Sequence, residues 1–151
     1  MQKFSTSILI NAPQKKVWDI LLGPATYREW TKPFNPTSCY EGDWSEGSII
    51  KFLGTDENGQ NEGGILSRIA KNIPYEFISI EHLGIIENGV EDTTSEKAKS
   101  WAPAFENYTL TEKDGQTEFT VEQDLDEGYL EMFDGMWKEA LQRLKELAEQ
   151  K

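Results

Sequence analysis

The sequence contains little of what disulfides, metal sites and membrane spans are built from. It has one cysteine, Cys39, and one histidine, His82, in 151 residues. A single cysteine excludes an internal disulfide, and a single histidine without His-x-His or Cys-x-x-Cys spacing gives no support for a zinc site. The first apolar run, Ile8-Leu9-Ile10, ends at Asn11 and is too short for a signal peptide or a membrane span. We therefore expect a cytoplasmic protein with no bound metal and no membrane segment.

Basic residues are also scarce. Fifteen Lys and Arg residues stand against 27 Asp and Glu residues, which gives a net charge of −12. Charge of this sign repels phosphate backbones and anionic lipid surfaces, so nucleic acid and membranes are poor candidate partners. The glycines between 54 and 64 lack the spacing of a phosphate-binding loop, so no nucleotide cofactor is expected. Hydrophobic residues make up 37% of the chain and include five tryptophans, enough for the core of one domain spanning residues 1–151.

The order of predicted elements begins with a strand and two short helices. Residues 4–10 alternate between two faces, which predicts a strand. Asn11 is a common capping residue and Pro13 fits a first turn, so a helix should follow and end at Gly23-Pro24. A second helix is predicted at residues 25–30, because the prolines at positions 33 and 36 prevent its continuation. Residues 38–125 show the patterns of strands and turns.

Two turn signals predict antiparallel hairpins. A turn at Asn58-Gly59 pairs Phe52 with Ile65 and Ser48 with Ile69. A turn at Asp114-Gly115 pairs Leu110 with Phe119, Thr109 with Thr120 and Tyr108 with Val121. Continued outward, the second register places Glu106 opposite Gln123 and then Ala104 opposite Leu125. A polar pair thus interrupts an apolar stripe, which makes Glu106 and Gln123 candidate site residues.

The stretch between the strand predicted at 75–83 and the strand starting near Pro103 has no clear pattern. Residues 84–101 mix a few aliphatic side chains with many acids. A connection this long in a compact domain is usually functional or partly disordered. We expect an irregular lid here, and the sequence leaves open whether it is ordered.

The chain ends in one long amphipathic helix, predicted at residues 129–149. Its apolar arc covers about 160° of the helical wheel in the first half and about 120° in the second, whereas docking on a sheet needs about 100° or somewhat more. The extra width predicts a second apolar surface beside the sheet, a ligand cavity. The helix residues expected to line it are Tyr129, Met132, Phe133, Met136 and Trp137.

The sheet should supply the other wall of this cavity. His82 shares strand parity with Ile78 and Ile80, and Tyr108 shares a sheet face with the Glu106 and Gln123 pair. We expect all six side chains to line the cavity. A structural role for His82 is favoured over proton donation to a bound carbonyl, and Glu106 is the candidate base if it is enclosed.

Several segments resemble the START-like (SRPBCC) superfamily. Ile8-Leu9-Ile10-Asn11-Ala12-Pro13 with Val17-Trp18 is similar to its opening strand and helix, and Tyr27-Arg28-Glu29-Trp30 is similar to its second helix. Asp43-Trp44-Ser45-Glu46-Gly47 and Gly135-Met136-Trp137 with Leu141, Leu144-Lys145 and Leu147 resemble the branch that includes the C-terminal domain of heat-shock chaperone ATPase activators. The resemblance implies an α+β helix-grip fold, as in the birch pollen allergen, in which a curved antiparallel sheet wraps around the C-terminal helix and two short helices follow the first strand.

In relatives, the cavity of this fold holds lipids, sterols, polyketides or other apolar molecules, but fold alone does not assign function. The leading hypothesis is a non-enzymatic protein, a monomer or weak dimer, that binds a small hydrophobic ligand and needs no cofactor. The alternatives are a module that interacts with the heat-shock chaperone, and an enzyme of cyclase or dehydratase type that uses His82 or Glu106 as acid or base.

Overall fold

The computed structural model describes residues 2–56, 59 and 61–150 and contains both strands and helices. The strands are β1 (Gln2–Ile10), β2 (Cys39–Gly42), β3 (Ile49–Thr55), β4 (Glu62–Ile73), β5 (Phe77–Glu87), β6 (Val90–Asp92), β7 (Ala104–Lys113) and β8 (Gln116–Leu125). The helices are α1 (Gln14–Leu22), α2 (Pro24–Trp30), α3 (Glu96–Trp101) and α4 (Leu130–Glu149), and a single 3-10 turn, η1 (Glu127–Tyr129), leads into α4.

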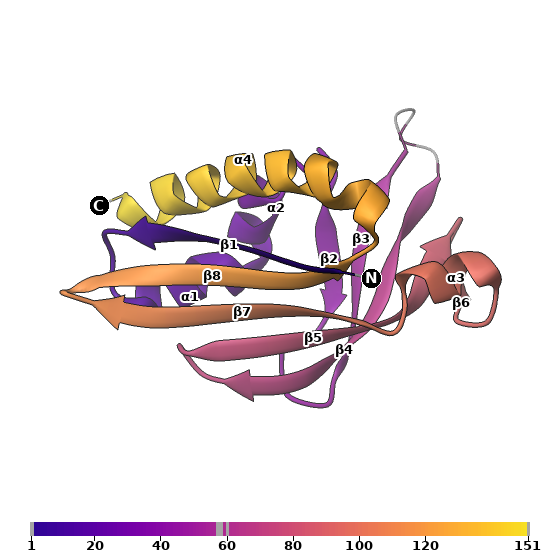
Figure 1. Cartoon of the computed structure of the whole chain (residues 1–151), viewed down its shortest axis with the longest axis horizontal. Coiled ribbons are helices and arrows are strands. Elements are labelled where there is room, and N and C mark those ends of the chain that lie inside the picture. The colour runs from indigo at the N-terminus through magenta and orange to yellow at the C-terminus, as the bar shows by residue number, and fades with distance from the viewer. Residues whose placement is uncertain (1, 57–58, 60, 151) are drawn as a thin grey trace.

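One antiparallel sheet forms the body of the protein. Its strand order is β1-β8-β7-β5-β4-β3-β2, with β6 paired to the end of β5. The first strand therefore lies beside the last, while β2 forms the opposite edge. The sheet curves so that β2 and β3 cross behind the other strands, and α1, α2 and α4 fill the enclosed side (Figure 1). The α+β helix-grip fold expected from the sequence is confirmed.

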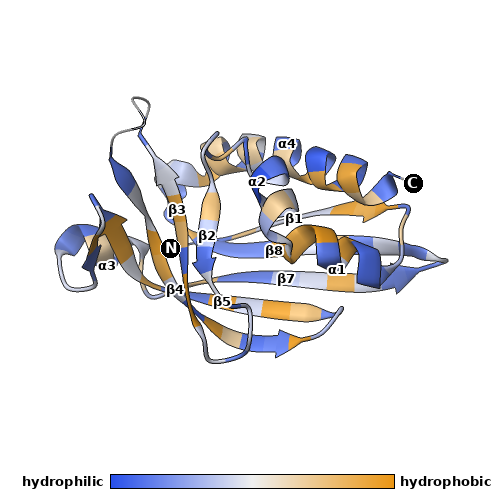
Figure 2. Cartoon of the chain, turned by 180° about the vertical axis from the view of Figure 1, so that it is seen from behind, coloured by the Kyte–Doolittle hydropathy of each residue, from blue (hydrophilic) through white to orange (hydrophobic). Residues whose placement is uncertain are grey.

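The two short helices lie against the sheet and the long helix: α1 lies over β7 and β8, and α2 contacts α4 and β2 (Figure 2). In α1, Val17, Trp18 and Leu21 are buried, and the break at Gly23-Pro24 lets α2 start at Pro24. The expected cap at Asn11 is wrong, because α1 begins three residues later with Pro13 at its N-cap and no side-chain cap. The backbone N–H of Asn11 instead donates to Glu149 Oε2 at 2.7 Å, which ties this loop to the end of α4.

The long helix α4 packs on β1, α1 and α2. Its second half contributes Ala140, Leu141, Leu144 and Ala148 to the core, with Leu147 partly buried against it. Apolar side chains at this spacing lie on one side of a helix, so this half docks the helix. Tyr129, predicted as its first residue, belongs instead to η1. No helix in the described part of the chain is long and apolar enough to cross a membrane.

Both predicted hairpin registers are present. Phe52 pairs with Ile65, and the Ile69 N–H donates to the Ser48 carbonyl at 2.9 Å. The turn expected at Asn58-Gly59 includes Asn58, which lies outside the described residues. In the second hairpin, every pair from Glu106 with Gln123 to Leu110 with Phe119 forms as predicted.

The prediction that residues 84–101 are irregular is wrong, although the end of this segment, Ser100 and Trp101, does line the cavity described below. Strand β5 continues through Ile85 and Ile86 to a tight turn at Asn88-Gly89, where both residues have positive φ, and β6 pairs back on β5. The Asn-Gly signal for this turn is present in the sequence. It is hard to interpret because Ile85 and Ile86 are both buried, so the strand lacks the usual alternation. The rest of the segment forms α3, capped by the Ser95 side chain.

Candidate ligand cavity

A cavity of about 500 Å³ lies between the sheet and the helices. The side of the helices contributes Tyr27, Trp30, Phe34, Phe133, Met136 and Trp137. The sheet contributes Phe52, Ile65, His82, Glu106, Tyr108 and Gln123. The remaining lining includes the buried residues Leu53, Ala104 and Leu125. It also includes exposed or partly exposed residues from the β3–β4 end, the end of β8 and α3, among them Asp56, Asn61, Asp126 and Trp101. The cavity is thus mainly aromatic inside and polar at its mouth.

The aromatic wall is centred on Trp137. Its ring centroid lies 4.9 Å from that of Phe34, 5.9 Å from Trp30 and 6.1 Å from Tyr108. Aromatic pairs at these distances contribute about 0.5–1.5 kcal/mol each beyond their buried area. The rings therefore hold one another in place, and the wall is formed without help from a ligand.

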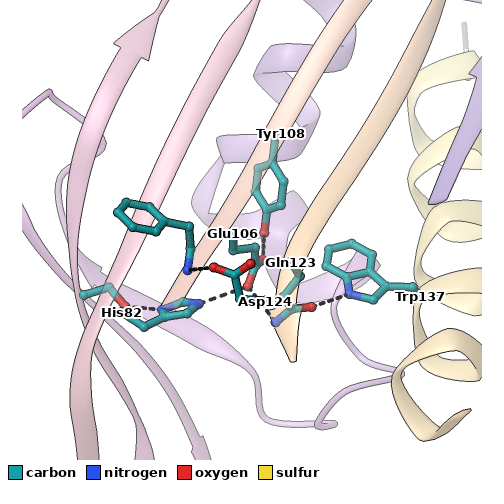
Figure 3. Close-up of polar contacts among 8 residues, drawn as sticks. His82, Glu106, Tyr108, Gln123, Asp124 and Trp137 are labelled. Carbon is teal, nitrogen blue, oxygen red and sulfur yellow. Dashed lines mark hydrogen bonds and ion pairs between the residues drawn. The ribbon is translucent and has the colours of Figure 1, made fainter. Parts of the chain in front are cut away.

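A row of hydrogen bonds crosses the sheet beneath these rings, as Figure 3 shows. Ser67 Oγ on β4 lies 2.7 Å from His82 Nδ1 on β5, and His82 Nε2 lies 3.2 Å from Glu106 Oε1 on β7. Gln123 Nε2 on β8 donates to the same Glu106 oxygen at 3.1 Å, and Trp137 Nε1 on α4 donates to Gln123 Oε1 at 2.9 Å. The Tyr108 hydroxyl donates to Glu106 Oε2. Glu106 is therefore the centre of a polar network that joins four strands to α4.

Strand register explains why these side chains meet. Glu106 is directly opposite Gln123, and Ser67 is directly opposite His82. Glu106 is opposite Ile80, two residues before His82, so the His82 side chain reaches it diagonally on the same face. Period-two alternation on neighbouring strands is thus enough to align the row.

Burial raises the pKa of two tyrosines near Glu106. Burial, and then the nearby negative charge of Glu106, raises the pKa of Tyr108 well above its ordinary value. The same two causes, in the same order, raise the pKa of Tyr27. The shift moves both phenols further from ionisation, and the Tyr108 hydroxyl donates a hydrogen bond to Glu106.

His82 bridges a hydroxyl and a carboxylate, an arrangement superficially like a hydrolytic triad. An ionised carboxylate can only accept a hydrogen bond, so His82 Nε2 is the donor to an ionised Glu106. Ser67, however, is fully buried and is not among the lining residues. A nucleophile must touch its substrate, so this serine does not have that role. Within the described ranges, no three His, Cys, Asp or Glu side chains are arranged to hold a metal ion.

The structure brings seven of the eleven predicted ligand residues to the cavity: His82, Glu106, Tyr108, Gln123, Phe133, Met136 and Trp137. The other four lie elsewhere. Ile78 and Ile80 are fully buried in the core, away from the lining. Tyr129 and Met132 are 39% and 51% exposed and do not line the cavity, so the extra width of the apolar arc extends past it to the surface. Tyr129 instead stacks on Trp101, with ring centroids 4.9 Å apart.

Sequence reasoning missed the contribution of α2 and the loop after it. Tyr27, Trp30 and Phe34 line the cavity, and Tyr27 and Trp30 are almost completely buried. The available signal was the spacing of two aromatic residues three apart on one helical face. Ser67 was also missed, because a lone serine in a strand has no distinguishing pattern.

Comparison with known proteins gives one family and many similar structures. The sequence model of the family described as "Activator of Hsp90 ATPase homolog 1-like protein" matches residues 11–149. A search of curated proteins found no match.

Three solved structures illustrate the structural similarity. Protein CV1439 from Chromobacterium violaceum has a TM-score of 0.72 at 17% identity, with 99% of this chain and 98% of that chain covered. The Aha1 dimer from Colwellia psychrerythraea has a TM-score of 0.72 at 20% identity, covering 99% and 97%. Protein ChR145 from Cytophaga hutchinsonii has a TM-score of 0.71 at 21% identity, covering 99% and 94%. Identities this low show a shared fold only.

Proposed function

The chain belongs to the activator of Hsp90 ATPase homolog 1-like family, within the START-like superfamily, and from this premise we propose that it binds a small apolar ligand in its cavity. The observation that carries the proposal is the cavity of about 500 Å³, with aromatic walls and a few convergent polar groups. Small-molecule sites typically have about 300–1,000 Å³ and this same composition. The aromatic contacts around Trp137 support a preformed site, which binds without a large ordering cost.

The proposal is for binding rather than catalysis. Both ring nitrogens of His82 have partners, and Glu106 already accepts three hydrogen bonds. Proton donation to a ligand by His82 would first require one of its hydrogen bonds to break, whereas an orienting role at Glu106 uses the network as it is. The arrangement therefore supports a fixed polar anchor at the base of an apolar site.

Titration with the neutral fluorescent probe N-phenyl-1-naphthylamine tests this function. We expect saturable uptake at about one probe per chain. Two neighbouring residues of α4 provide a matched pair of variants, because Phe133 lines the cavity while Met132 is exposed. Phe133→Ala should weaken binding about tenfold, the equivalent of losing ~1.4 kcal/mol of apolar contact, and Met132→Ala should leave it unchanged. Absence of saturable uptake would refute the proposal.

A second candidate function is interaction with the chaperone Hsp90. It is favoured by the printed description of the family and by the similarity to the Aha1 dimer from Colwellia psychrerythraea. This function predicts that the protein co-purifies with Hsp90 and changes its ATPase rate. If neither is observed with the purified chaperone, the interaction is rejected, and the ligand-binding proposal is unaffected.

Location and assembly remain predictions. We propose a cytoplasmic protein, consistent with its single free cysteine, and a monomer or weak dimer. Fractionation of the source cells and analytical ultracentrifugation test these two points.

A further inference from the structure

We propose that the ligand is an apolar amine, whose protonated nitrogen binds at Glu106 while its apolar body occupies the aromatic part of the cavity. The inference rests on the proposed binding function and names its ligand class. It follows from the charges that line the cavity, from the unused hydrogen-bonding capacity of Glu106 and from the aromatic surfaces beside it.

The charged groups of the cavity are almost all negative. Among the described lining residues there are four carboxylates and neither lysine nor arginine, and His82 is the only group that can become positive. Two of the carboxylates have neighbours that reduce the attraction they would exert on a cation in the cavity. Asp124 accepts from the Phe105 N–H at 2.9 Å and lies 4.0 Å from Lys3 Nζ. Asn61 Nδ2 donates to Asp56 Oδ2 at 2.7 Å.

Glu106 lies deeper than these carboxylates, with its side chain only 13% exposed. A charge in such a site is weakly screened, because water and salt have little access to it. The net charge of −12 adds a long-range attraction for cations. An anionic ligand such as a fatty acid would bring a second negative charge close to Glu106, so the site selects against it.

The hydrogen bonds of Glu106 leave room for one more donor. A carboxylate has about four lone-pair sites, and Gln123, His82 and Tyr108 occupy three. The donors around it are nearly all used, since Trp137 donates to Gln123 and Tyr108 donates to Glu106. The polar base of the cavity therefore presents acceptors, and it suits a ligand group that donates hydrogen bonds.

The aromatic rings favour a cation over a neutral donor. Tyr108 and Trp137 both line the cavity and both belong to the hydrogen-bonded network of Glu106. These two rings meet the network through their O–H and N–H groups, so a cation–π attraction, which an alcohol would lack, arises only where the ammonium group also reaches the face of a lining ring. A desolvated ammonium–carboxylate contact adds a charge-assisted hydrogen bond, which is about twice as strong as a neutral one.

Three ligands with the same ring system test the inference by displacement of N-phenyl-1-naphthylamine. They are 2-naphthylmethylamine, which is protonated at neutral pH, 2-naphthylmethanol and 2-naphthoate. We expect the amine to bind at least about tenfold more tightly than the alcohol, and the carboxylate to bind most weakly. If the probe binds but the amine is no tighter than the alcohol, the inference is overturned and the binding function stands. If the probe itself does not bind, both fail.

Removing the charge of Glu106 tests the location of the amine. Glu106→Gln keeps the shape of the side chain: its amide oxygen can replace Oε1 and accept from Gln123 and His82, while its NH2 group replaces Oε2 and the Tyr108 hydroxyl turns to accept from it. The amine should lose about tenfold in affinity and the alcohol less than about threefold. Glu122→Gln makes the same change in net charge one position before Gln123, on the opposite sheet face and outside the lining, and should have less than a twofold effect. Equal losses in the two variants would overturn the assignment to Glu106.

Discussion

Replacing Trp137 with phenylalanine separates the hydrogen-bonded network from simple core packing. The indole N–H donates to Gln123 Oε1 at 2.9 Å in a buried pair. Trp137→Phe keeps an aromatic ring but leaves this oxygen without a donor, which costs about 1–2 kcal/mol. The smaller ring buries about 40 Å² less apolar surface, worth about 1 kcal/mol. The free energy of unfolding should therefore fall by about 2–3 kcal/mol, and the melting temperature by about 5–10 °C.

A double-mutant cycle isolates the hydrogen bond. Gln123→Met has similar length but no amide oxygen, so Trp137→Phe in that background should cost only the ~1 kcal/mol assigned to ring size. The coupling free energy is then about 1–2 kcal/mol. Urea unfolding should be followed by far-ultraviolet circular dichroism, because the substitution alters tryptophan fluorescence. A coupling below about 0.5 kcal/mol would refute the view that this bond orders the base of the cavity.

Three further predictions concern single residues outside the hydrogen-bonded network of Glu106. Gly64→Ala should destabilise the protein by about 3 kcal/mol in urea unfolding, because the added Cβ would lie 1.8 Å from the Phe52 carbonyl oxygen at a φ of +158°; a loss below 1 kcal/mol would contradict this. Hydrogen bonds from Ser95 lower the pKa of the Asp92 carboxyl. The stabilisation that ionised Asp92 gives the folded state should be present above the ordinary aspartate range and be lost as pH falls through the lowered pKa. A carboxyl carbon NMR titration of Asp92 with an ordinary or raised midpoint would contradict the lowered pKa. Trp101→Ala should speed probe release about threefold in stopped-flow experiments by opening the mouth, whereas exposed Lys99→Ala on the same helix should not.

The polar pair at the centre of the site was predictable because one turn fixes a hairpin register. Asp114 and Gly115 both have positive φ, and the strands beside them pair as a two-residue turn requires, which brings Glu106 opposite Gln123. The turn lies eight residues from Glu106 on one side and eight from Gln123 on the other, so the local sequence determines that these two residues pair.

The rest of the site depends on contacts between segments distant in sequence. His82 reaches Glu106 only because β5 pairs directly with β7, although β6 and α3 lie between them in the sequence. No sequence signal specifies that pairing. Trp30 and Phe34 meet Trp137 because α2 and the loop after it pack on α4. Met132 was predicted to line the cavity but is exposed. A helical wheel shows how wide the apolar arc of a helix is, but not which edge of that arc other elements cover.

The indole N–H signals of the five tryptophans provide the most direct test that this cavity binds a ligand. Trp30, Trp101 and Trp137 line the cavity, while Trp18 does not and serves as the internal control. Trp44 is not a control, because its ring packs against the lining residues Tyr27 and Phe52. In a proton–nitrogen correlation spectrum titrated with N-phenyl-1-naphthylamine, we expect saturable shifts of the three cavity signals at one equivalent, with the Trp18 signal almost unmoved. No saturable shift, or a shift of Trp18 equal to those of the cavity signals, would contradict ligand binding in this cavity.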